Sequence, residues 1–252
     1  MARNRQRETI RIAMMMAAGY GTRMGNLTRQ LPKPLLPLNG WRIIDVILKK
    51  LERQGFKRVV INLHYLPELV RSHIKSKQWK MEICFSEEAE LLGTGGGIAK
   101  AEPFFEGETI LTVNADVLCD IDLQEFISYH NRFHPLATMA VLPSGNNWDY
   151  SLVVFDEENN LHGFLAKNEK IPPSLHSGIF IGYQLLTPEA RRYLSQTPQS
   201  IITEFYSRAL QGDKPLKIYP FNGRWIDVGT EAFYLSLRKK IQNGEINLET
   251  FT

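Results

Sequence analysis

The 252-residue sequence has no apolar run that approaches the roughly 20 residues needed to cross a membrane. The stretch IAMMMAA follows several arginines, as in a signal peptide, but it is short and no cleavage region follows it. We therefore expect a flexible basic tail over residues 1–9 that leads into a buried strand. This reading predicts no membrane partner and a cytoplasmic location.

The sequence also lacks a large excess of charge of either sign. Thirty Lys and Arg residues stand against 27 Asp and Glu residues, which leaves a net charge of +3. Nucleic-acid binding usually needs a broad basic surface, so we expect no nucleic-acid partner and only local anion sites. The only two cysteines, Cys84 and Cys119, lie in apolar strand-like segments without a metal-ligand pattern, which predicts free buried thiols.

The apolar pattern predicts an α/β protein. With 43% hydrophobic residues the chain can bury a large core. Strand-like and helix-like segments alternate through the first half, which predicts a doubly wound, mostly parallel mixed sheet of Rossmann-like type. Shorter strand-like segments after Pro135 predict extra strands on the same core, because no low-complexity linker divides them. We expect one domain over residues 10–240 and a C-terminal tail over residues 241–252.

Local signals mark two of the helices. Apolar residues recur at helical spacing through IIDVILKKLERQ, and Gly55 follows as a plausible C-terminal cap. Asp122 with Glu125 forms a capping-box-like start for DLQEFISYHNRF.

Glycines and basic residues gather directly after the first predicted strand, in MAAGYGTRMG and LTRQLPKPL. Glycine lets backbone N–H groups approach a ligand closely, and the neighbouring arginine and lysine indicate that this ligand is anionic. The glycines read G-x-G-x-x-x-G, no ribose-binding acid ends the second strand, and no Gly-Lys-Ser/Thr occurs. These features disfavour a dinucleotide site and a Walker A loop. An ordinary strand-to-helix turn is the alternative for the loop taken alone.

Two further strand ends carry informative residues. In open α/β sheets ligands bind beyond the carboxyl ends of the strands. SEEAELLGTGGG follows the third predicted strand, and VNAD ends the fourth. Two glycine-rich loops beside one acidic strand end indicate a nucleotide and a metal.

Four stretches together resemble the motifs of the sugar-1-phosphate nucleotidyltransferase family: MAAGYGTRMGNLTRQLPKPLLPLNG, SEEAELLGTGGG, VNAD and WIDVGT. They follow the expected order between about Ile10 and Tyr234, and the chain is especially similar to short single-domain members that act on heptose 1-phosphate or N-acetylmuramate 1-phosphate. The resemblance implies that a sugar 1-phosphate oxygen attacks the α-phosphorus of a nucleoside triphosphate (NTP), which releases pyrophosphate and leaves an NDP-sugar. Such chemistry depends on charge neutralisation and in-line positioning.

The resemblance also implies roles for single residues. Arg23 would pair with the β- or γ-phosphate, and Lys33 would stabilise the α-phosphate in the transition state. Asp116 and Asp227 match the family's Mg²⁺-binding pair, although a lone aspartate after a strand is more often a cap or turn residue. The residues expected to bind nucleotide are Ala18, Gly19, Gly21, Thr22, Glu88, Gly93 and Thr94.

Glu88 and the loop that starts at Gly93 occupy the family's base-recognition region. A carboxylate can accept two hydrogen bonds from guanine, whereas uracil offers one imide N–H between two carbonyls, so the residue favours GTP over UTP. The alternative reading of Glu88 is a solvated charge in an acidic cluster.

The expected sugar side departs from the family pattern. Many members carry Glu-Lys-Pro and then Asn-Ala-Gly, whereas this chain reads AKNEKIPPSLHSG. Lys167 is expected to bind the sugar phosphate, but Ala166 replaces the acid before it. His176 and Ser177 replace Asn-Ala before Gly178, and all three are candidate sugar-binding residues, with a structural histidine as the alternative for His176. A different sugar or a weakened sugar site would follow.

We therefore expect a Mg²⁺-dependent transferase that uses an NTP and a sugar 1-phosphate, as a monomer or homodimer. A non-catalytic nucleotide-sugar sensor of the same fold is the second hypothesis, and retention of Arg23, Lys33, Asp116 and Asp227 argues against it. An NAD(P)-dependent oxidoreductase is the third, disfavoured by the missing ribose acid.

Overall fold

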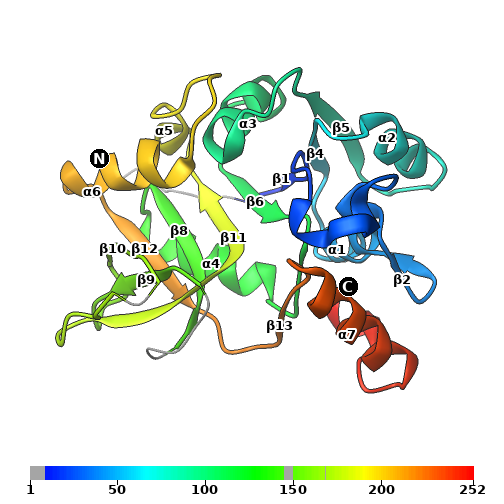
Figure 1. Cartoon of the computed structure of the whole chain (residues 1–252). Coiled ribbons are helices and arrows are strands. Elements are labelled where there is room, and N and C mark those ends of the chain that lie inside the picture. Colours follow the sequence, from blue (N-terminus) through cyan, green and yellow to red (C-terminus); the bar gives the residue numbers. More distant parts are fainter. Residues whose placement is uncertain (1–8, 145–149, 168) are drawn as a thin grey trace.

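A nine-stranded mixed sheet forms the centre of the computed structural model, which describes residues 9–144, 150–167 and 169–252 (Figure 1). Seven strands run in the order β10-β9-β11-β6-β1-β4-β5, and β8 joins β11 to β12 off this path. The basic tail expected over residues 1–9 lies outside the described residues except for Thr9, and so does residue 168 of the sugar-side motif.

The first half of the chain builds the parallel part of the sheet. Its central strand β1 pairs in parallel with β4 and β6, and β4 pairs in parallel with β5. The register places Met16 beside both Asn62 and Asn114, so the carboxyl ends of these strands lie at one edge. The four strands are β1 Ile12–Met16, β4 Arg58–Leu63, β5 Glu82–Glu87 and β6 Ile110–Asn114. This is the predicted βαβ arrangement.

The second half adds an antiparallel extension to the same sheet. The long strand β11 pairs antiparallel with β6, β8 and β9, and β12 returns parallel to β8. The prediction of extra strands on the same core is therefore confirmed. Their bounds are β8 Ala137–Pro143, β9 Leu152–Phe155, β10 Leu161–Leu165, β11 His176–Leu186 and β12 Leu216–Pro220.

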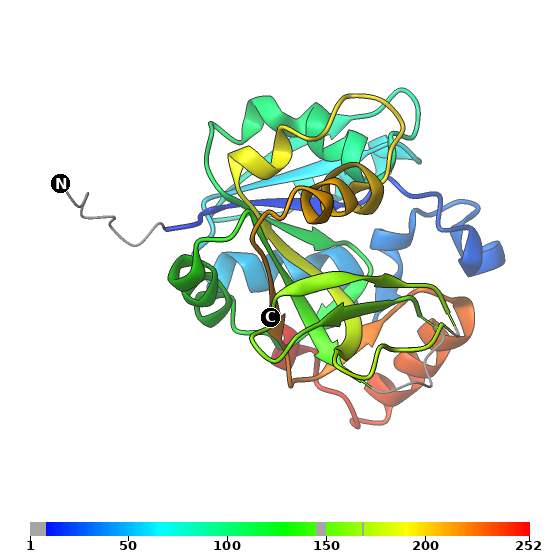
Figure 2. The same cartoon turned by 90° about the vertical axis from the view of Figure 1, so that its left-hand side faces the viewer.

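Helices cover both faces of the sheet (Figure 2). Alternating side chains of β1 divide between two apolar clusters: Ala13 and Met15 join residues of α1, α2, α4 and α7, while Ile12 and Met14 join residues of α3, α5, η4 and α6. A strand buried on both faces reads as a continuous apolar run, as IAMMM does. The helices are η1 Thr22–Thr28, η2 Lys33–Leu35, α1 Ile43–Arg53, α2 Pro67–Lys75, α3 Gly93–Ala101, η3 Glu102–Phe104, α4 Leu123–Phe133, α5 Pro188–Arg191, the π-helix η4 Ile202–Ser207, α6 Arg208–Gln211, α7 Glu231–Gln242 and η5 Leu248–Phe251.

The two predicted helix signals are confirmed. The Asp122 carboxylate accepts hydrogen bonds from the amides of Gln124 and Glu125 at the start of α4. Gly55, two residues after the end of α1, has φ +86°, a conformation that glycine adopts cheaply. Both cysteines are free, but only Cys119 is buried, whereas Cys84 is partly exposed. No helix within the described ranges combines the length and apolarity needed to span a membrane.

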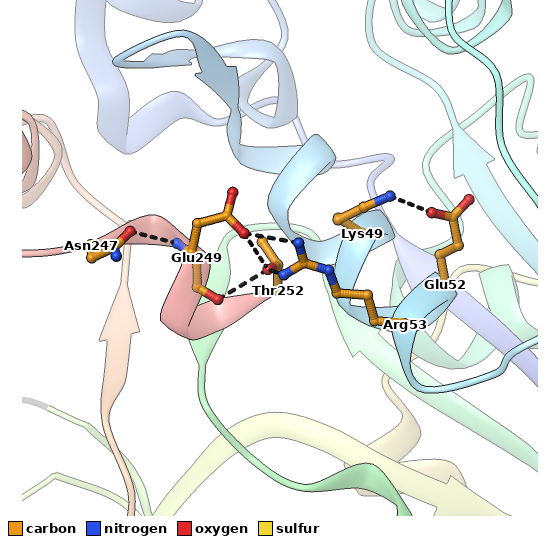
Figure 3. Close-up of polar contacts among 6 residues, drawn as sticks. All are labelled: Lys49, Glu52, Arg53, Asn247, Glu249 and Thr252. Atoms are coloured by element: carbon orange, nitrogen blue, oxygen red, sulfur yellow. Dashed lines mark hydrogen bonds and ion pairs between the residues drawn. The ribbon is translucent and has the colours of Figure 1, made fainter.

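The last residues, expected as a C-terminal tail over residues 241–252, pack onto the domain. Leu248 and Phe251 of η5 are buried against the core that includes α1. On the surface, Arg53 of α1 donates to the Glu249 carboxylate at 2.9 Å and also contacts Thr252 (Figure 3).

Candidate active site

A pocket of about 200 Å³ lies beyond the carboxyl ends of β1 and β6. Since these strands are neighbours, the loops that follow them meet at this point. The pocket brings together six of the predicted nucleotide, catalytic and metal residues: Gly19, Gly21, Thr22, Arg23, Lys33 and Asp116. Pro34 and Gly229 also line it.

Two glycines shape the loop after β1 in different ways. Gly21 has φ +66°, and an added Cβ would lie 3.1 Å from the Thr28 side chain and 3.2 Å from the Lys33 Cβ. Thr28 in turn donates its hydroxyl to the Gly21 carbonyl at 3.1 Å. Nothing lies within 4 Å of the Cβ position at Gly19, so that glycine leaves open space in the pocket wall.

Lys33 and Asp116 form an ion pair in the pocket. The Lys33 Nζ lies 2.6 Å from Asp116 Oδ2, and only 9% of the lysine side chain is exposed against 29% of the aspartate. A nearly buried ammonium needs a partner, and Asp116 supplies the compensating charge. Lys33 is held in place because it begins η2, a short turn that follows Pro32.

The two predicted metal-binding residues, Asp116 and Asp227, are neighbours along the backbone of a two-strand ribbon. Strand β13, Trp225–Asp227, pairs with β7, Val117–Cys119, so that Asp227 lies opposite Val117. The amide of Val228 then donates to the Asp116 carbonyl at 2.9 Å. A two-strand ribbon therefore joins motifs that are far apart in the sequence.

Asp227 has its own surroundings. The Tyr150 hydroxyl donates to Asp227 Oδ2 at 3.0 Å. An added Cβ at Gly229 would lie 2.8 Å from Asp227 Oδ1, so the glycine leaves room for this carboxylate. Two carboxylates beside a phosphate-sized pocket suit Mg²⁺, which commonly takes one or two carboxylates together with substrate phosphates and water. In the part of the chain that the structure describes, no group of three or more His, Cys, Asp or Glu side chains gathers as a ligand set.

Glu88 lies in a buried hydrogen-bond network and is 3% exposed. Its Oε1 accepts from Asn62 Nδ2 at 2.7 Å and its Oε2 from the Leu92 amide at 2.9 Å. Asn62 Oδ1 accepts from the amide of Ala17, the first residue after β1, at 2.7 Å. Glu88 thus ties the phosphate-side loop to the start of α3. The reading of Glu88 as a solvated charge is wrong, and a guanine base would have to share or replace these bonds.

The segment 195–201 covers the start of α3. An added Cβ on Gly93 would lie 2.6 Å from the Gln199 carbonyl oxygen, and the amide of Ile201 donates to Thr94 Oγ1 at 3.0 Å. The glycines of this motif therefore admit a second segment of the same chain. Gly93 and Thr94, which we expected to bind nucleotide, are not among the residues that line the pocket.

An aromatic group fastens the glycine loop to the segment that follows β4. The Tyr20 hydroxyl lies 2.8 Å from His64 Nε2, and His64 Nδ1 lies 2.9 Å from the Glu88 carbonyl. The carbonyl can only accept, so Nδ1 carries a proton, and in the neutral imidazole Nε2 then accepts from Tyr20. Tyr65 packs edge-on against Tyr20 and donates to the Thr28 carbonyl at 2.8 Å.

A second pocket, of about 480 Å³, adjoins the carboxylate pair through Tyr150, which lines it and donates to Asp227. Sequence reasoning singled out only Ala166 among its residues, because segments from five places in the chain meet here and no local pattern marks them. The lining residues are Met139, Tyr150, Ser151, Val153, Phe164, Leu165, Ala166, Ile179, Phe180 and Ile202.

The predicted sugar-binding residues lie outside this lining. Ser177 is buried and donates to a backbone carbonyl at 2.7 Å, and an added Cβ on Gly178 would lie 2.5 Å from a carbonyl oxygen of β8. His176 is exposed, with its ring 5.8 Å from that of Phe155. These contacts serve strand packing. Lys167 is exposed in the turn after β10, next to Ala166 of the second pocket.

Comparisons with known proteins agree with this geometry. A family model described as nucleotidyl transferase matches residues 12–244. The chain is 28% identical over 229 residues to the mannose-1-phosphate guanylyltransferase catalytic subunit beta of Drosophila pseudoobscura pseudoobscura, covering 89% of this chain and 60% of the relative. It is 25% identical over 253 residues to the UTP–glucose-1-phosphate uridylyltransferase of Synechocystis sp., covering 93% of this chain and 64% of the relative. The chain thus spans less than two thirds of the length of these curated relatives.

Solved structures share the fold. HddC from Yersinia pseudotuberculosis superposes with a TM-score of 0.78 at 22% identity, covering 92% of this chain and 100% of HddC. A UDP-glucose pyrophosphorylase complexed with UDP-glucose gives a TM-score of 0.78 at 20% identity, covering 94% of this chain and 100% of that one. The predicted α/β fold with a mostly parallel mixed sheet is confirmed.

Proposed function

The chain belongs to the nucleotidyl transferase family, and from that membership we propose that it joins a sugar 1-phosphate to a nucleoside triphosphate, giving an NDP-sugar and pyrophosphate. A phosphate oxygen of the sugar attacks the α-phosphorus, one P–O bond forms, and the bond to the pyrophosphate leaving group breaks. The observation that carries the proposal is the first pocket, where a glycine loop, two cationic side chains and an aspartate converge beside a second carboxylate.

The cationic residues would handle the triphosphate. Arg23 lines the pocket from an exposed position in η1, where its planar guanidinium suits bidentate pairing with the β- or γ-phosphate. Lys33 is fixed by its ion pair and lines the same pocket, a suitable place to stabilise charge that grows on the α-phosphate. The open space at Gly19 leaves room for phosphate oxygens near the loop amides.

Asp116 and Asp227 would hold Mg²⁺. When bound, the ion would supply positive charge to the phosphates and favour their in-line arrangement. The chain's own contribution is to hold the two carboxylates together through the β7–β13 ribbon and the bond from the Val228 amide to the Asp116 carbonyl.

GTP and UTP are the proposed nucleotides, and the names of the relatives above include both guanylyl and uridylyl transfer. The acceptor sugar would extend from the carboxylate pair toward the second pocket, since Tyr150 belongs to both places.

The test is pyrophosphate release with Mg²⁺ across a grid of GTP, UTP, ATP, CTP and dTTP against 1-phosphates of heptose, mannose, glucose, N-acetylglucosamine and N-acetylmuramate. Arg23→Ala and Asp116→Asn serve as blanks, and Lys49→Met, which changes an ion pair on α1 outside the pocket, serves as the control. We expect release in at least one combination, lost in both blanks and kept in the control. No release in any combination, or release that survives Asp116→Asn, would contradict the proposal.

A further inference from the structure

The second pocket is built almost entirely from apolar side chains. Eight of its ten lining residues are apolar, and no charged side chain is among the lining residues that the structure describes. Met139, Val153 and Ile179 form a buried floor on three adjoining strands. Phe164 of β10 and Ile202, the first residue of the π-helix η4, add partly buried walls.

The few polar groups of this pocket are mostly in use or lie at its edge. The Tyr150 hydroxyl donates to Asp227, and the Tyr150 ring packs edge-on against Trp225 at 5.4 Å. Ser151 is exposed. Ala166, also exposed, presents a methyl group at the point where the sequence comparison led us to look for a carboxylate.

The chemistry of this lining limits what can be bound there. A sugar hydroxyl that leaves water needs a hydrogen-bond partner, because burying it unpaired is costly. A methyl or acyl chain needs none, and it gains from each CH₂ group that it buries. A pocket of about 480 Å³ is large enough for such a substituent and for part of the ring that carries it.

We infer that the second pocket selects an acceptor that carries an apolar substituent, such as an N-acyl or alkyl group, directed away from its 1-phosphate. The inference rests on the proposed function, because Tyr150 connects this pocket to the carboxylate that would lie beside the reacting phosphate. The pocket would thereby discriminate between acceptors by the length of their apolar substituent rather than by hydrogen bonds to sugar hydroxyl groups.

The test measures binding, so that it does not depend on turnover. The full chain is titrated by calorimetry with a series of N-acetyl-, N-propanoyl- and N-butanoyl-glucosamine 1-phosphates, with glucosamine 1-phosphate as the reference. Mg²⁺ and a non-hydrolysable GTP analogue are present, and the titrations are repeated with the UTP analogue. We expect the affinity to rise about fourfold for each added CH₂ group until the pocket is full.

Variants separate the pocket from general effects. Ala166→Glu places a carboxylate in the lining at an exposed position, so the protein should fold and the rise along the series should disappear. Ala232→Glu makes the same change at an exposed position of α7 outside the pocket and should keep the rise. A flat or falling series, an equal rise in Ala166→Glu, or no binding of any acceptor would overturn the inference. Rising affinity without pyrophosphate release would instead contradict the proposed function and leave the pocket assignment standing.

Discussion

Replacing Lys33 with methionine should separate catalysis from stability. The variant keeps most of the side-chain volume but removes the charge whose Nζ lies 2.6 Å from Asp116. If Lys33 stabilises the transition state, its loss should lower kcat by about 10²- to 10³-fold, or about 3–4 kcal/mol. The Asp116 side chain is 29% exposed, so water can solvate the carboxylate left behind and the cost in stability should be about 1 kcal/mol or less.

The same substitution should free Asp116 for a cation. In the ligand-free protein the ammonium occupies one face of this carboxylate, so Mn²⁺, used as a spectroscopic substitute for Mg²⁺, should bind Lys33→Met up to about fivefold more tightly. The assays are pyrophosphate release, thermal unfolding and Mn²⁺ binding by electron paramagnetic resonance. The control is Lys49→Met, which removes an ion pair with Glu52 that has the same 2.6 Å separation but lies outside the pocket. It should change pyrophosphate release, thermal unfolding and Mn²⁺ binding only slightly. A fall in kcat of less than tenfold, or weaker Mn²⁺ binding, would refute the reasoning.

Three further predictions test other parts of the structure. Gly19→Ala should leave thermal stability unchanged but raise KM for the nucleotide, because its added Cβ meets only open space. Gly96→Ala should lower stability by about 1–3 kcal/mol, because its added Cβ would lie 2.3 Å from the Thr197 carbonyl oxygen. Equal melting temperatures for the two variants would contradict this contrast. Glu88→Gln should reduce kcat/KM for GTP and UTP by similar factors, because Glu88 positions the loop; a changed preference between the two would mean that it reads the base. Burial lowers the pKa of His130 from 6.5 to about 4, so its neutral form contributes stability that is complete above pH 6.5 and is lost as the pH falls toward 4. Denaturant unfolding should show about 3 kcal/mol of this loss, and His130→Gln should flatten it; an unchanged slope in the variant would exclude His130 as its source.

Much of the fold could be predicted because its signals are local. The buried run IAMMM, the Asp122 cap and the glycine after α1 each act within a few residues. The docking of η5 depends on the burial of Leu248 and Phe251 against the core, beside an exposed pair between Arg53 and Glu249. No local pattern reveals these long-range contacts, which make the expected tail part of the domain.

The candidate site was predictable where strand ends carry charge. Arg23, Lys33 and Asp116 meet in one pocket because the strands before them are adjacent in the sheet, and Asp227 follows through the β7–β13 ribbon. The nucleotide-binding role of Gly93 stays a prediction, since a glycine that admits a neighbouring backbone looks the same in the sequence as one that admits a ligand.

The sugar side was the least predictable part. The apolar pocket combines residues of β8, β9, β10, β11 and η4, and each of them reads as ordinary core when taken alone. The motif residues His176, Ser177 and Gly178 lie outside it because β11 uses them for pairing and packing. Only the three-dimensional arrangement shows which apolar side chains leave a cavity between them.

The most direct test of the central claim follows the label of a radioactive nucleotide. The protein is incubated with Mg²⁺, the acceptor that gives the highest pyrophosphate release, and the NTP labelled with ³²P at either the α- or the γ-position. Nucleotidyl transfer predicts that the α-label appears in the sugar product, that the γ-label appears in pyrophosphate, and that both products are lost in Lys33→Met. A γ-label on the sugar would mean attack at the terminal phosphate. A sugar that gains no label from either form of the NTP would mean that no transfer occurs. Either result would contradict the account.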